Sequence, residues 1–430
     1  MIRATTGGVL KGYRRNLMSS FIARNKAQDT VLTRRNFNSY AEDPASAAKA
    51  FRLRKSRMAT QSQYAICNDT YKKFQTAFTC LDTIDKLIDT KNGEPMSTLK
   101  STTLEMLNDP KGDARTQLNK VLDQLSETIV QNLNQKYGDT FIFAGADGHN
   151  VPFEVKDNKL YYRGVSVDAA RPNVLMDSAA NPPAMVTDAN GNYVLASSAE
   201  KSLNQTEYDD AIANGEAPAD FITYHVTDNA GVTTARYIRA ADAETMTTQE
   251  YDTAVTEAEK LEYLVNEKQF VDIGLGFQEN EHGTLIESSG FNAALNGLTF
   301  LGYGQDADGD PRNVYSLVQK MREVANRVED GDDWPKDVYD EFSGLVSKLE
   351  QASSDYKTEF TNMDAGTTKL KNNVALLEEN FYNLQEQYSD IEDVDMADAI
   401  TSFVWAQYCY NAALKVGNSV LSESLMDYLN

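Results

Sequence analysis

The sequence predicts a mainly α-helical protein with an inserted β-rich domain, in which segments near both ends of the chain form one long antiparallel coiled-coil or helical bundle. From Tyr356 onward, apolar residues recur in alternating steps of four and three, with Thr367 in the one position that is not apolar, which is the 3.5-residue period of a coiled-coil seam. No proline follows Pro335, so nothing in the composition breaks a helix here. The seam residues are Val346, Leu349, Tyr356, Phe360, Met363, Leu370, Val374, Leu377, Phe381, Leu384, Tyr388 and Ile391.

A partner for this stripe lies near the other end of the chain. Residues 64–88 repeat the same alternation, and residues 118–133 begin a second N-terminal helix of the same kind. Because an apolar stripe gains nothing while it faces water, one antiparallel bundle is the simplest assembly, and two unrelated bundles are the alternative. The expected bundle core contains Tyr71, Phe74, Phe78 and Leu81 together with Leu370, Leu377, Phe381 and Leu384.

Turns and changes in composition divide the chain into five segments. Asp43 and Pro44 have the chemistry of an N-cap and a first helical residue, and the helix that they open is expected to reach about Asp89. Residues 138–311 hold fifteen of the 24 glycines. The expected segments are an N-terminal assembly segment that is disordered in the monomer (1–40), the N-terminal half of the helical bundle (41–137), an inserted β-rich outer domain (138–311), the C-terminal half of the bundle (312–395) and a C-terminal assembly helix (396–430).

The inserted segment reads as short strands with some helix. Alternating or β-branched runs separated by turn residues favour a small antiparallel β domain. Residues 199–215 and 240–265 are polar and rich in Ala and Glu, which favours helix. A short helix is also expected between the turns near residues 92 and 110. The predicted strands are Thr140–Phe143, Lys159–Tyr162, Asn192–Leu195, Phe221–Val226, Ala235–Ile238 and Gln269–Ile273.

The charge of the chain is strongly uneven. The net charge is −23, yet residues 1–60 carry thirteen Lys or Arg against three acids, so the remaining residues carry about −33. A surface of this sign repels phosphate, which argues against nucleic acid as a partner. The basic N-terminal arm either meets the acidic part of a neighbouring copy or is simply solvated. No apolar run reaches membrane-spanning length, and the first residues lack the apolar core of a cleavable secretory signal.

Residue patterns of known catalytic and metal sites are absent from the sequence. The three histidines have no metal-binding spacing, the three cysteines do not suggest a disulfide framework, and there is no nucleophile elbow or P-loop. The loop Asp306–Asp310 has the acidic character of a calcium loop, but Leu317 stands where a bidentate Glu is required. Glu392, Asp393 and Asp395 are interpreted as caps of the last helix. We therefore expect no enzymatic activity, no catalytic or metal-binding residues and no cofactor.

Two motifs flank the predicted bundle. Arg35–Ala45 is a short polar loop that ends in an Asp-Pro helix start, and Ile391–Ile400 precedes the last helix. The chain then ends through Ala412–Gly417 and Ser424–Leu429. These stretches resemble the flagellin superfamily. The resemblance covers roughly residues 1–140 and 305–430 and implies a structural subunit of the bacterial flagellum, secreted unfolded through the flagellar type III apparatus without a cleavable signal peptide.

Within that superfamily, three features are similar to the hook-filament junction branch, the third hook-associated proteins. They are Tyr137–Gly145, Val151–Phe153 and Phe291–Leu298. The Phe-Asn-Gly and paired leucines that filament flagellins usually carry are not found, and Arg34–Phe37 departs from the glycine-containing loop of many family members. Residues 155–290 match no pattern of the family.

The resemblance also implies partners and an interface. A junction protein forms a ring oligomer with itself between the first hook-associated protein and the filament flagellin, and it travels with an export chaperone. It has no nucleic-acid or membrane partner. The intersubunit stripe of the terminal helix would be Phe403, Tyr410, Leu414, Val420, Leu421 and Leu425.

Two alternatives stay open. The alternatives to a junction protein are filament flagellin itself and a surface-exposed adhesin or binding protein that uses residues 150–300. Exposed aromatic side chains in the inserted segment would support the second alternative, whereas a strand-face core is their ordinary explanation. The aromatic residues concerned are Tyr161, Tyr162, Tyr193, Tyr224 and Tyr237.

Overall fold

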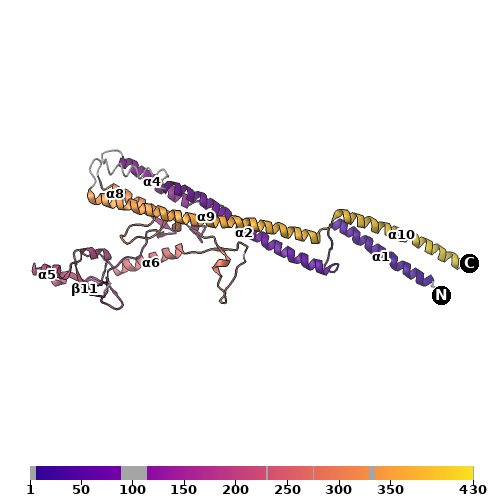
Figure 1. Cartoon of the computed structure of the whole chain (residues 1–430), viewed down its shortest axis with the longest axis horizontal. Coiled ribbons are helices and arrows are strands. Elements are labelled where there is room, and N and C mark those ends of the chain that lie inside the picture. Colours follow the sequence, from indigo (N-terminus) through magenta and orange to yellow (C-terminus); the bar gives the residue numbers. More distant parts are fainter. Residues whose placement is uncertain (1–5, 89–113, 229–230, 275, 329–334, 430) are drawn as a thin grey trace. The chain divides into compact units, whose positions relative to one another are not determined.

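The computed structural model describes residues 6–88, 114–228, 231–274, 276–328 and 335–429. Residue contacts divide the chain into two compact units. The first unit comprises Met1–Asn68, Asp272–Gly276 and Leu370–Asn430, and the second comprises Asp69–Val271 and Phe277–Lys369. Two long helices, α2 (Pro44–Ile88) and α9 (Lys336–Glu392), each contribute residues to both units (Figure 1).

The first unit consists mainly of helices from the two ends of the chain. Helix α1 (Thr6–Thr33) packs along α10 (Met396–Leu429), as Figure 1 shows. Helix α2 begins where the sequence predicts, because the Asp43 carboxylate accepts hydrogen bonds from the N–H groups of Ala45 (3.1 Å) and Ser46 (3.0 Å). These two donors would otherwise have no partner inside the helix, and Pro44 has no N–H to satisfy.

The second unit is built around the remaining parts of α2 and α9 with α4 (Ala114–Leu133) and α8 (Val314–Ala325). The Tyr356 hydroxyl donates a hydrogen bond to the Leu81 carbonyl oxygen at 2.6 Å, and the Ser353 hydroxyl donates to the Ile88 carbonyl oxygen at 3.0 Å. Burial raises the pKa of Tyr356, so its hydroxyl stays a donor. Both contacts join helix segments that are far apart in the sequence. The buried apolar side chains around them include Leu81, Ile84, Ile88, Leu122, Leu125, Ile129, Phe342, Leu345 and Leu349.

The region between the helical segments contains short strands and small helices. The strands are β1 (Lys136–Tyr137), β2 (Thr140–Phe141), β3 (Ala144–Gly145), β4 (Phe153–Lys156), β5 (Lys159–Tyr162), β6 (Val165–Ser166), β7 (Met176–Asp177), β8 (Ala184–Met185), β9 (Tyr193–Val194), β10 (Phe221–Thr227), β11 (Thr233–Arg239), β12 (Thr245–Met246), β13 (Phe270–Val271), β14 (Phe291–Asn292) and β15 (Leu295–Asn296). The helices are η1 (Ala196–Lys201), α5 (Gln205–Ala213), η2 (Pro218–Asp220), α6 (Thr248–Val265), η3 (Glu287–Ser289) and α7 (Gly297–Leu301).

Among the described residues, these strands form separate antiparallel ladders instead of one sheet. One ladder has three strands, β4-β5-β6, and the others have two. The longest pairs β10 with β11, so that Phe221 lies opposite Arg239 and Thr227 opposite Thr233. Its inner face covers a small core of Leu175, Val186, Val194, Ile222, Tyr224 and Ile238.

The chain leaves and re-enters the helical part at one place. Strand β3 pairs with β15, so that Ala144 lies opposite Asn296 and Gly145 opposite Leu295. Gly297 follows directly, and a Cβ atom there would lie 2.6 Å from the Phe153 ring. The sequence stretches that resemble an exit and a re-entry are therefore hydrogen-bonded neighbours.

Most predicted elements are found near their expected positions, and the prediction of a mainly α-helical chain with an inserted β-rich region is confirmed. Strand β5 has the predicted bounds, and α2 ends at Ile88. The heptad-based coiled coil, the domain boundaries and the disorder of residues 1–40 in a monomer remain predictions. The short helix expected between residues 92 and 110 lies outside the described residues. Among the helices that the structure describes, none combines the length and apolar character needed to span a membrane.

The contact between Tyr356 and Leu81 yields a testable prediction. Tyr356→Phe removes a buried hydrogen bond and should lower the free energy of unfolding by about 1 kcal/mol. Urea unfolding followed by circular dichroism measures the change. Tyr339→Phe, at a more exposed position of the same helix, is the control and should leave stability unchanged. Equal midpoints for both variants would contradict the structural role of the Tyr356 hydroxyl.

Candidate assembly interface

The connections that lead to α1 and α10 are fastened to each other by backbone hydrogen bonds. Arg35 forms an isolated antiparallel bridge with Asp393. The Asn36 N–H donates to the Glu392 carbonyl oxygen at 2.8 Å, and the Val394 N–H donates to the Arg34 carbonyl oxygen at 3.2 Å. Both polypeptide segments therefore change direction together.

The side chain of Asn36 completes this connection. Its amide donates to the carbonyl oxygens of Ile391 (3.0 Å) and Asp393 (2.9 Å). Carbonyl groups at a helix C-terminus have no partner inside the helix, and Asn36 supplies donors to the end of α9. Arg34, just before it, has φ of 61°, so the turn relies on a left-handed residue that is not glycine.

The carboxylate of Glu392, at the end of α9, lies at the centre of this connection between the two segments. The Glu392 side chain is only 4% exposed and forms ion pairs with Arg35 (3.2 Å) and Arg54 (3.0 Å). Arg54 also donates to the Tyr388 hydroxyl at 2.8 Å. Burial alone would raise the pKa of Glu392, but hydrogen bonds from Tyr388 and Arg54 and the positive charges of the two arginines hold it below its ordinary value. Arg35, Arg54 and Tyr388 thus stabilise the buried charge of Glu392, and we call these four residues the Glu392 cluster.

The sequence interpretation of this acidic run is right for one residue and wrong for another. Asp395 does cap α10, because its carboxylate accepts hydrogen bonds from the N–H groups of Ala397 (2.7 Å) and Asp398 (3.4 Å). Glu392 does not cap α10. It is the last residue of α9 and is paired with arginines that lie more than 300 residues away in the chain.

Helices α1 and α10 contact each other through aromatic side chains. The Phe21 and Tyr410 ring centroids are 5.8 Å apart. The Arg24 guanidinium lies 5.1 Å from the first ring centroid and 4.8 Å from the second, within cation–π range. Near the other end of the pair, Tyr13 lies against Gly417, where any Cβ atom would collide with the phenol.

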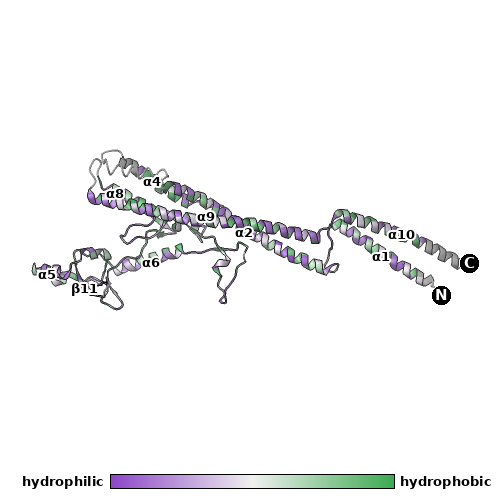
Figure 2. Ribbon diagram, viewed as in Figure 1, coloured by the Kyte–Doolittle hydropathy of each residue, from purple (hydrophilic) through white to green (hydrophobic). Residues whose placement is uncertain are grey.

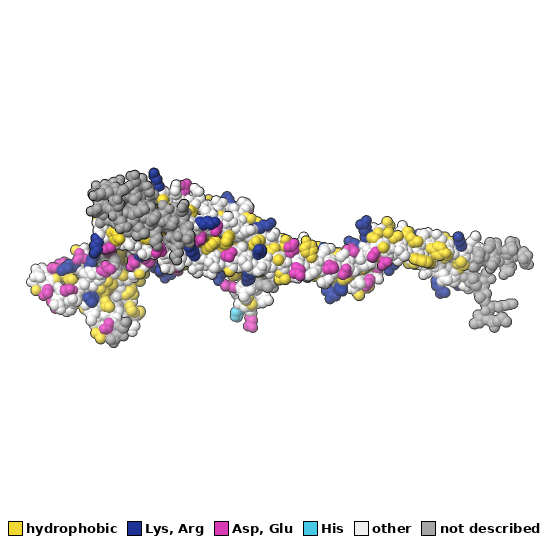
Figure 3. All heavy atoms as spheres, turned by 45° about the horizontal axis from the view of Figure 1, so that its top comes forward, with side chains coloured by type: hydrophobic (Ala, Val, Ile, Leu, Met, Phe, Trp, Pro, Cys, Tyr) yellow, Lys and Arg dark blue, Asp and Glu magenta, His cyan; other side chains and the backbone are white. Residues whose placement is uncertain are grey.

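Apolar side chains on this helix pair remain exposed to solvent. On α10, Ile400, Val404 and Tyr408 follow one another at intervals of four residues, and Trp405 lies beside them. Their exposed fractions are 48%, 59%, 68% and 64%, respectively. On α1, Met18 and Ile22 are each more than half exposed. Figure 2 shows hydrophobic residues recurring along both helices, and Figure 3 shows apolar side chains on one face of this part of the molecule. Contiguous apolar surface of this kind marks an interaction site.

The predicted interface residues differ in their burial and contacts. Tyr410 packs against Phe21 of the same chain, Phe403 is half-buried and Leu414 is exposed. Val420, Leu421 and Leu425 lie within α10, but their side chains are outside the described part of the chain. Sequence reasoning missed Val404, Trp405 and Tyr408. A signal for them existed, because no charged residue occurs between Asp398 and Lys415.

The predicted bundle-core residues are buried to different extents. Phe74, Leu81, Leu370 and Leu377 are buried, and Tyr71, Phe78, Phe381 and Leu384 are half-buried.

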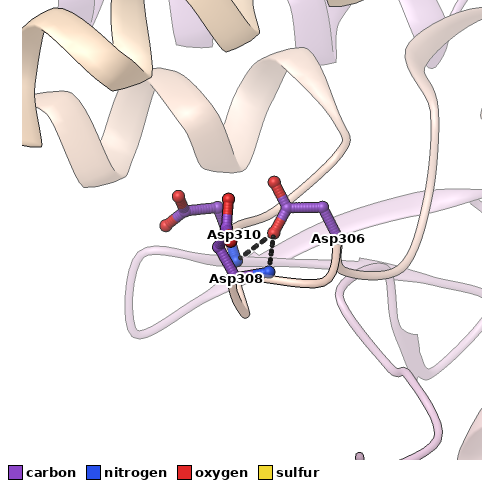
Figure 4. Close-up of side chains that lie close together, drawn as sticks. All are labelled: Asp306, Asp308 and Asp310. Atoms are coloured by element: carbon purple, nitrogen blue, oxygen red, sulfur yellow. Dashed lines mark hydrogen bonds between the residues drawn. The ribbon is translucent and has the colours of Figure 1, made fainter. Parts of the chain in front are cut away.

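The acidic loop near Asp306 is tied to lysines. The Asp306 carboxylate accepts hydrogen bonds from the N–H groups of Asp308 and Asp310 (Figure 4). The Lys348 ammonium lies 2.7 Å from Asp306 and 2.8 Å from Asp308, and it also pairs with Asp310, which receives Lys320 as well. Two ammonium groups therefore offset part of the charge of these three carboxylates and connect the loop to α8 and α9.

The aromatic residues of the inserted region do not form an exposed cluster. Tyr162 and Tyr224 are buried, and Tyr161 is half-buried. The Tyr193 ring packs edge-on against Tyr251 with centroids 4.9 Å apart. The Tyr237 ring stacks on Tyr208 at 3.9 Å. These contacts agree with the ordinary explanation of these tyrosines, in which they pack in a core on one face of the strands.

Comparison with known proteins gives similarity at the level of structure. No family model matches the chain, and no curated protein matches it. FlgL from Xanthomonas campestris is similar with a TM-score of 0.40 and 15% identity, over 78% of this chain and 99% of that one. Flagellar hook-associated protein-3 from Legionella pneumophila gives a TM-score of 0.39 and 11% identity, over 79% and 98%.

The Glu392 cluster yields a prediction with a defined pH dependence. Glu392→Gln leaves Arg35 and Arg54 without a counter-charge and should lower the free energy of unfolding at neutral pH by about 1–2 kcal/mol, since both arginines are partly solvated. A depressed folded-state pKa stabilises the protein above the ordinary carboxyl pKa of 4.5, and that stabilisation disappears as the pH falls through the folded-state value.

Unfolding measured between neutral pH and about pH 3 tests both parts of this prediction. The difference between wild type and Glu392→Gln should shrink as the carboxylate becomes protonated. Glu378→Gln, at an exposed position of the same helix, is the control. A difference that stays constant with pH would show that Glu392 is not ionised in the folded protein.

Proposed function

We propose that this chain is a structural subunit of the bacterial flagellum that forms the junction ring between hook and filament. The observation that carries the proposal is the exposed apolar face of α10, formed by Ile400, Val404, Trp405 and Tyr408. It begins in the motif Ile391–Ile400 that resembles the flagellin superfamily. An apolar helix face that its own chain leaves in water is suited to burial between copies in an assembly.

The same surface supports the proposed partners. Copies of the chain would pack against one another through α1 and α10, with the first hook-associated protein on one side of the ring and filament flagellin on the other. Before assembly this apolar surface needs cover, which fits an export chaperone and secretion through the flagellar type III apparatus. The location would then be extracellular, and the role structural instead of enzymatic.

The arrangement of the chain fits such a role. The Glu392 cluster holds together the two segments that lead to α1 and α10, so both terminal helices extend as a pair within the first unit. A subunit that presents a fixed pair of helices can repeat the same contact around a ring.

Deletion of the gene in its motile host tests the proposal. The expected result is cells with hooks but no filaments, with intact flagellin shed into the medium. Loss of the main secreted flagellin would instead identify the chain as filament flagellin. Normal swimming filaments would reject the junction role and favour a binding protein.

Exposed aromatic residues of α10 allow a sharper test in the deletion strain. The double variant Trp405→Ser with Tyr408→Ser should change the free energy of unfolding by less than about 0.5 kcal/mol, because both side chains are solvent-exposed. It should nevertheless fail to restore filaments, because the apolar face would be lost. Electron microscopy of cells and thermal unfolding of the purified variant measure the two effects.

A matched control lies on α6. Tyr263 is 72% exposed, and Tyr263→Ser removes a comparable aromatic surface outside the terminal helices. It should restore filaments like the wild type. Filament restoration by the Trp405 and Tyr408 double variant would contradict an assembly role for the α10 face.

A further inference from the structure

The first unit carries two long stretches of opposite charge on its two central helices. In α2, residues 44–68 contain five Lys or Arg and no acidic residue. In α9, residues 372–392 contain five Asp or Glu and no basic residue. Both stretches belong to the first unit, so they can be compared directly.

Some charged residues of these stretches face the other helix of the same chain, and others face solvent. Arg54 and Arg57 of α2 turn towards α9, where they donate hydrogen bonds to Tyr388 and Gln385, respectively. Arg52 and Lys55, between and beside them, are exposed. The outer side of α2 therefore keeps basic groups that the contact with α9 does not use.

The outer side of α2 is also apolar. Phe51, Met58 and Ile66 are 56%, 58% and 42% exposed, respectively. Phe51 and Met58 are one heptad apart, so they lie on one side of the helix together with Lys55. We call Phe51, Arg52, Lys55, Met58 and Ile66 the basic outer face.

Helix α9 presents the complementary combination on its own outer side. Leu376 and Tyr382 are 53% and 62% exposed. Glu386 and Asp390 are exposed as well, four residues apart on the same side of the helix as Leu376. We call Leu376, Tyr382, Glu386 and Asp390 the acidic outer face. It spans about 20 Å, which is close to the span of the basic outer face at 1.5 Å per residue.

The register between α2 and α9 within one chain indicates which residues of the basic and acidic outer faces would meet. Arg54 lies beside Tyr388 and Arg57 beside Gln385, so the two helices run antiparallel in this register. A neighbouring copy at the same height, related by rotation about an axis along these helices, would present its α9 to this α2 in the same register. That register places Arg52 opposite Asp390, Lys55 beside Glu386 and Ile66 opposite Leu376.

We propose that the basic outer face of α2 in one copy docks onto the acidic outer face of α9 in the next copy, so that identical copies associate head to tail around a ring. Two different faces of one chain meet in such a contact, and repetition closes a ring when the rotation allows it. The exposed ion pairs set register and orientation, while the apolar residues between them supply buried area. This inference deepens the proposed function and rests on it.

Charge reversal tests the docking. Arg52→Glu with Lys55→Glu reverses the basic outer face, and Glu386→Lys with Asp390→Lys reverses the acidic outer face. Each double variant should give at least about tenfold fewer filaments in the deletion strain, because attraction becomes repulsion at every repeated contact. The fourfold variant, with both faces reversed, should restore filaments because opposite charges again meet.

Controls separate this result from misfolding and from failure of the proposed function. The wild-type gene must restore filaments in the deletion strain, which tests the proposed function alone. Lys371→Glu reverses an exposed charge that lies five residues before Leu376, outside the span of the acidic outer face, and should behave as wild type. Filament formation by both double variants, or a fourfold variant no better than either double variant, would overturn the docking.

Disulfide formation gives a second test that does not depend on charge. In a Cys409→Ser background, Ile66→Cys with Leu376→Cys should yield disulfide-linked chains of copies when assembled flagella are oxidised, and neither cysteine alone should do so. Absence of linked copies in filament-bearing cells would overturn the proposed register.

Discussion

The buried carboxylate of Glu392 is the interaction on which the arrangement of the chain ends depends. Removing a carboxylate from water is costly unless positive groups and hydrogen bonds replace the lost hydration. Arg35, Arg54 and Tyr388 provide that replacement, and they come from the loop before α2, from α2 itself and from α9. One charge can therefore be satisfied only when segments from both ends of the chain meet. The direction in which α1 and α10 continue follows from this meeting point.

The sequence predicted the long helices well because their signal is local and repeated. The period of apolar residues located α2 and α9, and the chemistry of Asp43 and Pro44 located the start of α2. The function of Glu392 was not predictable in the same way. An acidic residue before an apolar run looks the same whether it caps the next helix or binds a distant arginine. Asp395 caps and Glu392 does not, and only the position of Arg54 in space distinguishes them.

The short strands also show that a local sequence pattern predicts local pairing but not pairing between distant segments. Strand β5 was predicted with its bounds because Lys159–Tyr162 forms a hairpin with its immediate neighbours. Strands β3 and β15 have two residues each and pair across the whole inserted region, so neither is long enough to show the residue alternation of a strand. Their pairing, and the tight packing of Gly297 on Phe153, bring the two ends of the inserted region together. The inserted region also contacts the long helices elsewhere, because the Gln63 amide donates to the Asp272 carboxylate and the Asn373 amide donates to the Ile273 carbonyl oxygen.

The exposed surface of α10 and the outer faces of α2 and α9 favour different kinds of association. Helix α10 has no charge between Asp398 and Lys415, so its exposed face can attract a neighbour strongly but discriminates little between partners and orientations. The outer faces of α2 and α9 combine fewer apolar groups with fixed charges, which favours one orientation and one register. An assembly that used α10 alone would be stable but poorly defined, and one that used the charged faces alone would be defined but weak in salt. Because the Glu392 cluster connects both surfaces within one unit, a correct match at α2 and α9 would also bring neighbouring α10 helices into position.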